Sequence, residues 1–346
     1  MKKTKLISIL IILIGIYFTS CNRKENNTQQ LIPKKDIAAF INDSLITIQE
    51  LDNSVQQELY DELNRIYAIR KVSLDYMITE KIFEIEAKKA GVTVENYINK
   101  YYYDNLTDNL LTSFIKKNKL ESGIIELKRT LRLVNINSPE GEKLLYKEYK
   151  NYLRKHLADS LRLAYNIKIN LTPPQSPSFS LNKIFAHYRG NLNSKVIMLE
   201  ISDLECSSCK ESYPIFKQIY DKYKDQVKFG FTHFSSYVSV SAIACECASL
   251  QGKFWEMHDS IFELSNLPDT TAIMNIAKKM GLDINQFRID FKDSTIVSNI
   301  ENNFRNIHDK GIYATPTIII NNKAIFNSAS LEEIENLLSQ ELGKLE

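Results

Sequence analysis

A proline-rich segment divides this chain into two parts with different sequence patterns. Pro173, Pro174 and Pro177 lie within residues 171–180, and prolines this closely spaced exclude a helix or a central strand there. The chain has 346 residues, a length that suits about two domains. We therefore expect a linker at residues 171–180 between a domain over residues 36–170 and a domain over residues 181–346.

Residues 36–170 have the pattern of an all-α domain. Apolar residues recur at four-residue spacing from Leu51 to Leu63, which places them on one helix face. Gly91 follows two lysines and an alanine and marks the end of a second helix, and Thr93 is a candidate N-cap for the next one. Glycine and proline are scarce in this region, so it can hold several long helices.

After residue 180 the pattern changes to short apolar strands that alternate with helices. A hairpin is indicated at Asn321-Asn322, and Ser330 with Glu333 forms a capping box for a last helix. This order predicts an α/β fold with a mixed sheet and flanking helices. The expected strands lie at residues 195–201, 227–234, 317–320 and 324–326, and the expected helices at 212–224, 239–264, 270–308 (two helices) and 331–342.

The first twenty residues have the composition of a secretory signal. Three lysines precede an apolar run of about 13 residues, which is shorter than the ~20 residues of a membrane-spanning helix. The run ends in Thr19-Ser20-Cys21, and small residues directly before a cysteine resemble the bacterial lipobox, whose cysteine is acylated. We expect a lipoprotein signal peptide at residues 1–20, lipid attachment at Cys21 and a flexible tether over residues 21–35. The protein would then be a lipid-anchored membrane protein of the bacterial cell envelope that faces the periplasm, and an uncleaved anchor is the alternative.

The overall charge gives no sign of a nucleic-acid partner. The chain has 44 Lys and Arg against 42 Asp and Glu, with a formal net charge of +2, so it lacks the basic excess of nucleic-acid-binding proteins. Its five cysteines are too few for a disulfide-dense scaffold of this size. Each cysteine therefore needs its own explanation.

The motif Cys206-Ser-Ser-Cys209 follows a predicted strand and opens a predicted helix. Free N–H groups and the dipole at a helix N-terminus stabilise an anion, which favours the reactive thiolate of Cys206. The spacing places Cys209 within reach of the first sulfur, so it can resolve a mixed disulfide. The tetrapeptide alone also fits half of a zinc site, a structural disulfide or chance.

Three further features favour redox chemistry. Glu200 lies inside the apolar strand, where a buried carboxylate is costly unless it has a use, such as accepting the proton of the resolving thiol; a solvent-facing Glu is the alternative. Pro214 falls inside the helix that the dithiol opens. Pro316 directly precedes an apolar strand, and a cis bond there would present the backbone of Thr315 to an extended peptide.

Three segments together resemble the DsbA-like thioredoxin-fold oxidoreductases: residues 199–210, 251–259 and 311–317. The resemblance implies a thioredoxin fold with a helical insertion over residues 181–346. It assigns Cys206 as the nucleophile of the redox disulfide, Cys209 as the resolving thiol, Glu200 as the buried acid, and Pro316, after Thr315, as the cis-proline.

The same resemblance implies the activity and its partners. The chain would be a protein thiol–disulfide oxidoreductase without an organic cofactor, acting on exported cysteine-containing proteins and recharged by an unidentified redox partner. Strong oxidants of the family have Pro-His between the cysteines, whereas this chain has Ser207-Ser208. This difference implies a less oxidising dithiol, and oxidation, isomerisation and reduction all stay open.

The helical part is similar to the N-terminal chaperone domain of SurA-type periplasmic proteins. The similarity lies in residues 40–51 and 86–95. It implies a module that binds unfolded polypeptide, with a helical spacer or a dimerisation module as the alternative.

Two other cysteines leave further alternatives open. Cys245 and Cys247 lie two residues apart in a helical stretch and cannot form a disulfide with each other. We expect Cys247 to pack in the core, whereas Cys245 could be exposed to solvent. A holdase or assembly lipoprotein with a structural or vestigial CxxC is one alternative function. A zinc or copper(I) protein that uses all four cysteines is another.

Overall fold

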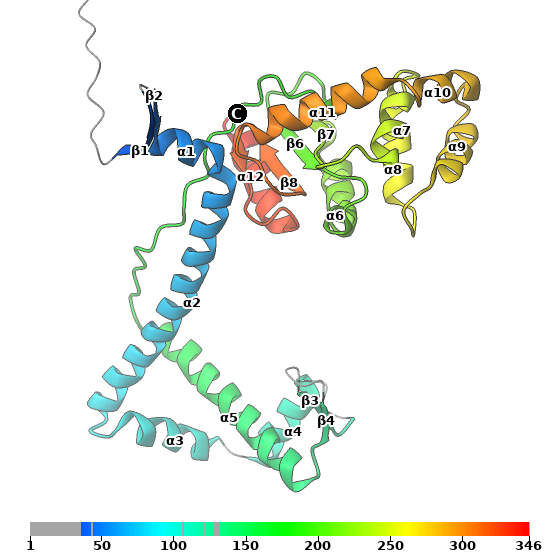
Figure 1. Ribbon diagram of the computed structural model, residues 1–346. Helices are drawn as coiled ribbons and strands as arrows, with labels where there is room; N and C mark the ends of the chain where they lie inside the picture. Colours follow the sequence, from blue (N-terminus) through cyan, green and yellow to red (C-terminus); the bar gives the residue numbers. More distant parts are fainter. Residues whose placement is uncertain are drawn as a thin grey trace, which may run out of the picture. The chain divides into compact units, whose positions relative to one another are not determined.

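The computed structural model describes residues 36–42, 44–105, 107–118, 120, 122–127 and 132–345 (Figure 1). The predicted signal peptide, the tether and Cys21 lie outside the described residues. The chain divides into two compact units, Met1–Leu51 and Asp52–Glu346. Within the described ranges, no helix combines the length and the apolar character needed to cross a membrane.

The described part of the first unit contains an antiparallel hairpin, β1 (Ile37–Ile41) and β2 (Ser44–Thr47). Helix α1 (Ile48–Ser54) follows it directly. The hydroxyl of Thr47 accepts from the N–H of Glu50 at 3.0 Å, and the Glu50 carboxylate accepts from the N–H of Thr47 at 2.8 Å. This reciprocal capping box fixes the start of the helix.

The N-terminal region of the second unit is mostly helical, as predicted. It contains α2 (Gln56–Lys89), α3 (Val94–Asp104), α4 (Asp108–Lys117), a hairpin of β3 (Ile124–Leu127) with β4 (Arg132–Asn135), and α5 (Pro139–Arg162). Gly91, with φ of +68°, follows α2, and the Thr93 hydroxyl caps α3, both as predicted. The two hairpins were not predicted, because their strands of four or five residues are too short for a clear alternation.

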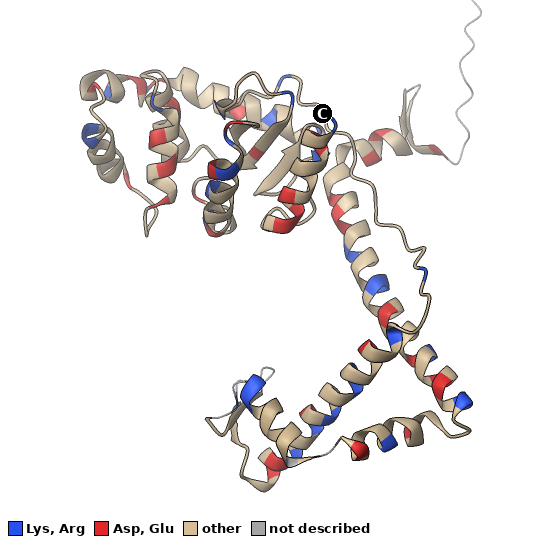
Figure 2. Cartoon of the chain, turned by 180° about the vertical axis from the view of Figure 1, so that it is seen from behind, with Lys and Arg blue, Asp and Glu red and all other residues tan. Residues whose placement is uncertain are grey.

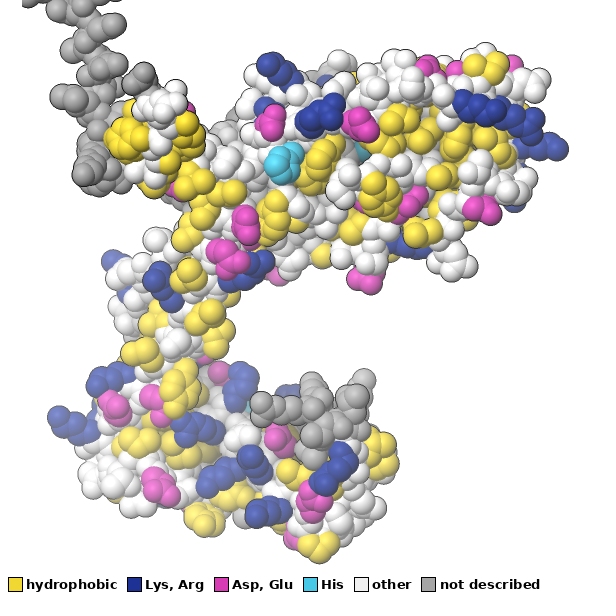
Figure 3. Space-filling view, viewed as in Figure 1, with side chains coloured by type: hydrophobic (Ala, Val, Ile, Leu, Met, Phe, Trp, Pro, Cys, Tyr) yellow, Lys and Arg dark blue, Asp and Glu magenta, His cyan; other side chains and the backbone are white. Residues whose placement is uncertain are grey.

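Helix α2 leaves a row of apolar side chains exposed to solvent (Figure 3). They recur mostly at intervals of three or four residues, so the pattern that predicts a helix also describes an uncovered surface. We call this set the α2 row; its members are Leu59, Leu63, Ile66, Ile69, Val72, Tyr76 and Met77. Charged residues of both signs are interspersed along the described helices (Figure 2), in keeping with the small net charge.

A five-stranded mixed sheet forms the centre of the C-terminal half. Its order is β5-β7-β6-β8-β9, with β6 parallel to β7 and antiparallel to β8. Ile201 near the end of β6 pairs with Thr317 at the start of β8. The segment that leaves β6 and the loop that enters β8 therefore lie at the same end of the sheet. The strands are β5 (His187–Gly190), β6 (Ile197–Ser202), β7 (Lys228–His233), β8 (Thr317–Ile320) and β9 (Lys323–Ala324).

Helices cover both faces of this sheet, as the α/β prediction requires. Helices α6 (Ser207–Tyr223) and α12 (Leu331–Gly343) pack on the face that carries Met198 and Ile318. Helix α11 (Ser294–His308) packs on the opposite face, against Leu199 and Ile201. The insertion consists of α7 (Val240–Ser249), α8 (Phe254–Phe262), α9 (Thr270–Lys279) and α10 (Ile284–Asp290), so residues 270–308 form three helices where two were predicted.

The end of the proline-rich segment belongs to the sheet edge. Phe179 is only 1% exposed, and its N–H donates to the carbonyl of Asn322 at 2.9 Å. Ser178 forms an isolated bridge with Lys323 in β9. The second half of the segment therefore packs against the edge strand β9. The domain boundary predicted at residues 171–180 stays a prediction.

The first turn of α2 packs against the loop that leads into β8. The N–H of Gln57 donates to the carbonyl of Gly311 at 3.1 Å. Gly311 has φ of +70°, and a Cβ there would come within 2.6 Å of the Asn53 carbonyl oxygen and 2.8 Å of the Gln56 nitrogen. Only glycine therefore allows this close approach of two backbones.

We predict that Gly311→Ala destabilises the protein more than Gly281→Ala does. Gly281 has a similar φ of +74° but open space around its Cβ position, so this control carries only the backbone strain, about 1 kcal/mol. Gly311→Ala adds a backbone clash and should cost at least about 1 kcal/mol more. Urea unfolding of both variants measures the difference, and equal losses would contradict the close approach.

Candidate functional site

Cys206 is the N-cap of α6, directly before the first helical turn. Strand β6 ends at Ser202, and the chain then turns so that the N–H of Cys206 donates to the carbonyl of Asp203 at 3.1 Å. The motif thus stands where the sequence predicted it, at the junction of a strand and a helix. Cys206 is half-buried, whereas Cys209, in the first turn, is fully buried. Pro214 lies inside α6, as predicted.

The pKa of Cys206 is lowered from its ordinary value. Burial alone would raise this pKa, but hydrogen bonds to the sulfur outweigh it. The donors are the backbone N–H groups of Cys209 and Ser208 and the side chains of Thr315 and Cys209. These contacts stabilise the thiolate, which is the attacking form of a cysteine.

The second cysteine has the opposite protonation. Burial raises the pKa of Cys209 to about 12, and its thiol acts as a donor toward the sulfur of Cys206. The two sulfurs are therefore close together and unequal: one is poised as an anion and the other holds its proton. This is the division between an attacking and a resolving thiol.

The loop before β8 faces the dithiol. The peptide bond between Thr315 and Pro316 is cis, as predicted. The side chain of Thr315 donates to Cys206 and also lowers the pKa of Cys209. Two motifs more than a hundred residues apart in sequence thus form one site, because β6 and β8 are neighbours in the sheet.

Glu200 is buried in the centre of β6, and its neighbours in the sheet are Phe231 and Ile318. Burial raises the pKa of Glu200 to about 7, although the positive charge of Arg189 partly lowers it. The hydroxyl of Ser202, two residues along β6 and on the same face of the sheet, lowers the pKa of both Glu200 and Cys209. The acid thus lies on the side of the sheet that carries the resolving thiol.

A cationic residue near Glu200 was not predicted as part of the site. Arg189 in β5 donates to Asp259 at 2.9 Å, and its guanidinium lies 4.0 Å from the ring centre of Trp255 and 4.1 Å from that of Tyr220. Together with Glu200 it lines a small cavity. Within the described ranges, Arg189 Nε and Glu200 Oε1 are buried without a hydrogen-bond partner. Arg189 comes from β5 and Glu200 from β6, so only the fold brings the two side chains together.

Cys245 and Cys247 are both fully buried in α7. The expectation that Cys245 could be exposed is therefore wrong, because Cys245 lies on the side of α7 that packs against the other helices of the insertion and α11. Burial raises the pKa of both thiols, that of Cys247 to about 12, which makes them unreactive. Among the residues that the structure describes, no three His, Cys, Asp or Glu side chains are grouped to hold a metal ion.

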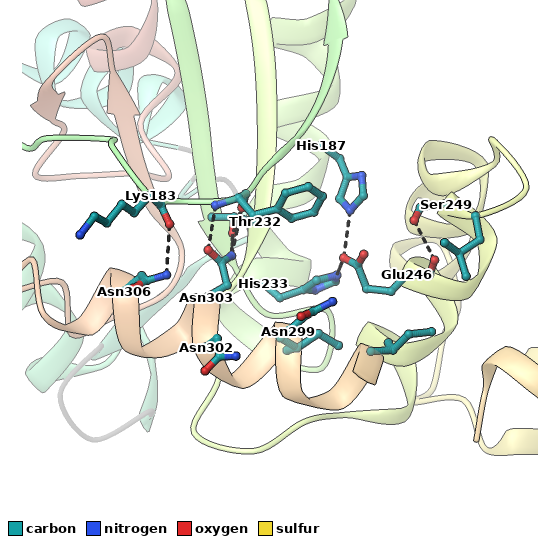
Figure 4. A pocket seen from close by; sticks show the side chains of 14 residues that line it. Lys183, His187, Thr232, His233, Glu246, Ser249, Asn299, Asn302, Asn303 and Asn306 are labelled. Atoms are coloured by element: carbon teal, nitrogen blue, oxygen red, sulfur yellow. Dashed lines mark hydrogen bonds and ion pairs between the residues drawn. The ribbon is translucent and has the colours of Figure 1, made fainter. Parts of the chain in front are cut away.

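A second pocket, of about 470 Å³, lies between strands β5 and β7 and helices α7 and α11 (Figure 4). In it the Glu246 carboxylate lies 2.9 Å from Nε2 of His187 and 3.3 Å from Nε2 of His233. Burial works to raise the pKa of Glu246, but these imidazoles hold it at about 2. Neither cysteine of the motif lines this pocket.

Comparison with known proteins agrees with this fold. The thioredoxin family model matches residues 183–340. A Na(+)/H(+) antiporter NhaA of Herminiimonas arsenicoxydans is 22% identical over 170 residues, which cover 49% of this chain and 26% of that protein. The chain spans about a quarter of the length of the curated relatives it matches. The C-terminal half is a thioredoxin-like α/β domain.

Solved structures similar to this half include oxidised BdbD from Bacillus subtilis. It is 26% identical, with a TM-score of 0.43 over 49% of this chain and 98% of that one. The thiol-disulfide exchange protein alpha-DsbA2 from Wolbachia pipientis is 24% identical, with a TM-score of 0.40 over 46% of this chain and 87% of that one.

The buried acid predicts a defined pH dependence of stability. The folded protein keeps a proton on Glu200 up to about pH 7, whereas the ordinary pKa is 4.5. Between these values the folded state binds the extra proton, so the free energy of unfolding falls as pH rises. Glu200→Gln removes this pH-dependent loss. From pH 5 to pH 8, the free energy of unfolding of the variant should therefore rise by up to about 3 kcal/mol relative to that of the unaltered protein.

Urea unfolding at the two pH values measures this gain. Glu301→Gln, the same change at an exposed position of α11, controls for the substitution itself. An equal stability difference at pH 5 and pH 8 for Glu200→Gln would show that the acid is not the source.

Proposed function

We propose that this protein is a thiol–disulfide oxidoreductase that acts on the cysteines of other proteins. One observation carries the proposal. The half-buried Cys206 is the N-cap of α6 and has a lowered pKa, and it lies beside the protonated Cys209 and the side chain of Thr315. A structural disulfide needs no such asymmetry between its two thiols. The thioredoxin-like fold supports the same activity.

The reaction follows from the two unequal sulfurs. The thiolate of Cys206 attacks a substrate disulfide, forms a mixed disulfide and releases one substrate sulfur as a thiolate. Cys209 then loses its proton to the carboxylate of Glu200 and attacks Cys206, which releases the second substrate sulfur. The substrate is reduced and the protein is oxidised to the Cys206–Cys209 disulfide; the reverse sequence oxidises a substrate dithiol. Ser207 and Ser208 supply no positive charge to stabilise the thiolate. We therefore propose that this dithiol is a weaker oxidant than the strongest members with a thioredoxin-like fold.

The substrates and the location belong to the same proposal. We propose exported cysteine-containing proteins as substrates, a separate redox partner that recharges the dithiol, and a lipid anchor at Cys21 that holds the protein at the periplasmic side of the envelope. The support is the signal-like composition of residues 1–20 and the small residues before Cys21.

We predict that Cys206→Ala abolishes disulfide exchange. Exchange is measured by the reduction of a scrambled test protein in a glutathione buffer. Cys209→Ala should still attack and should accumulate a mixed disulfide, visible on a non-reducing gel and cleaved by dithiothreitol. Cys247→Ala, which removes a buried thiol outside the motif, should exchange normally. Full exchange by Cys206→Ala would contradict the proposal.

A second role, polypeptide binding by the helical region, is favoured by the exposed α2 row. Seven large apolar side chains on one helix are costly to leave in water unless something covers them. Ile69 and Val72 are 70% and 73% exposed. We propose that the α2 row binds apolar segments of unfolded polypeptide and so keeps the substrate on the protein that carries the dithiol. A second copy of this protein is the alternative occupant of the row.

We predict that Ile69→Ser with Val72→Ser reduces the suppression of aggregation of an unfolded test protein at least about twofold, measured by light scattering. Disulfide exchange with a short peptide should stay unchanged, because the dithiol is untouched. Lys71→Ser, at an exposed position between them, is the matched control. If the double variant instead becomes monomeric where the unaltered protein is dimeric, the row is a dimer interface.

A further inference from the structure

The amide of Gln57 is bound at both ends by the loop that faces the dithiol. Gln57 is only 6% exposed. Its Nε2 donates to Oγ1 of Thr317 at 2.6 Å, and its Oε1 accepts from the N–H of Tyr313 at 3.0 Å. Tyr313 and Thr317 lie on either side of Thr315-Pro316, so one side chain spans the whole loop.

The hydrogen bonds continue into a closed chain. The hydroxyl of Thr317, which accepts from Gln57, donates to the carbonyl of Ala314 at 2.7 Å. The backbone N–H of Gln57 donates to Gly311, and the Tyr313 hydroxyl donates to Asp61 one turn further along α2 at 2.9 Å. The conformation of the loop is therefore held by groups from a helix whose Gln57 lies 260 residues before Thr317 in the sequence.

We propose that Gln57 is a positioning residue of the redox site, which holds Thr315 against the sulfur of Cys206. This inference deepens the proposed function and rests on it. It assigns part of the redox site to the helical region, because Gln57 lies far outside residues 183–340, which match the thioredoxin family. The first turn of α2 is thus a component of the dithiol site as well as the start of the helix that carries the α2 row.

The consequence for Cys206 follows from the donors around its sulfur. Thr315 is one of the side chains that donate to Cys206. If the loop relaxes, this donor moves away, and the thiolate loses stabilisation while the disulfide form does not. The reduced state is then less favoured, so the dithiol becomes a weaker oxidant.

The test replaces Gln57 by methionine, which has nearly the same length but no amide. We expect Gln57→Met to shift the titration of Cys206, followed by the rate of alkylation against pH, to higher pH. We also expect its equilibrium with glutathione to move up to about tenfold toward the protein disulfide, which equals about 30 mV for a two-electron couple.

Gln56→Met is the matched control in the full chain. The Gln56 amide donates to the carbonyl of Lys310 at 2.6 Å, so this variant removes one contact of the same interface without touching the span across Thr315-Pro316. It should lower the melting temperature but leave the Cys206 titration and the glutathione equilibrium unchanged. A purely structural role for Gln57 predicts the same behaviour for both variants.

A second variant protects the test against misfolding. Thr317→Val keeps the shape of the buried side chain and removes the hydroxyl that links Gln57 to Ala314. It should reproduce the shift of Gln57→Met. Folded variants that titrate like the unaltered protein would overturn the proposal. Since alkylation reads the thiol itself, this result would be distinct from a failure of the proposed exchange activity.

Discussion

The pairing of β6 with β8 is the constraint on which the site depends. These strands run antiparallel, and Ile201 opposite Thr317 sets their register. The register brings the turn that ends in Cys206 beside the loop that ends in Pro316. A shift by one residue would turn the alternate side chains to the opposite face and separate the sulfur from Thr315. The apolar residues on the two faces of these strands, packed under α6 and α11, hold the register in place.

The buried polar groups show how the domain sustains an acid inside its core. Glu200 has no hydrogen-bonded ion pair among the described residues, yet a guanidinium lies near enough to moderate its pKa. Arg189 is in turn balanced by Asp259, and its flat faces lie against two aromatic rings. The arrangement keeps the pKa of Glu200 close to neutral, so the acid can gain or lose a proton near pH 7. A full salt bridge would have fixed it as an anion.

Local signals in the sequence predicted much of this molecule. The caps at Thr93 and Ser330 and the placement of Cys206 each depend on residues within one helical turn, and all three are present. The reciprocal half of the predicted capping box is different, because the Glu333 carboxylate accepts from the N–H of Asn327 at 3.2 Å and the N–H of Ser330 donates to the carbonyl of Asn327. The role of Gln57 could not be predicted, because an ordinary glutamine near a helix start has no local sign of a partner 260 residues away. The burial of Cys245 depends on helices packed around α7, and the short hairpins carry too few residues for a periodic pattern.

The position of Trp255 gives this chain an internal optical reporter. It is the single tryptophan, and it contacts Arg189, Phe231 and His258 within the C-terminal half. Its fluorescence therefore comes entirely from the thioredoxin-like half, while the eighteen tyrosines are spread over the chain. Selective excitation of the indole would follow the melting of that half alone, whereas circular dichroism would follow the helices of both halves. A difference between the two melting curves would therefore show that the N-terminal helices melt separately.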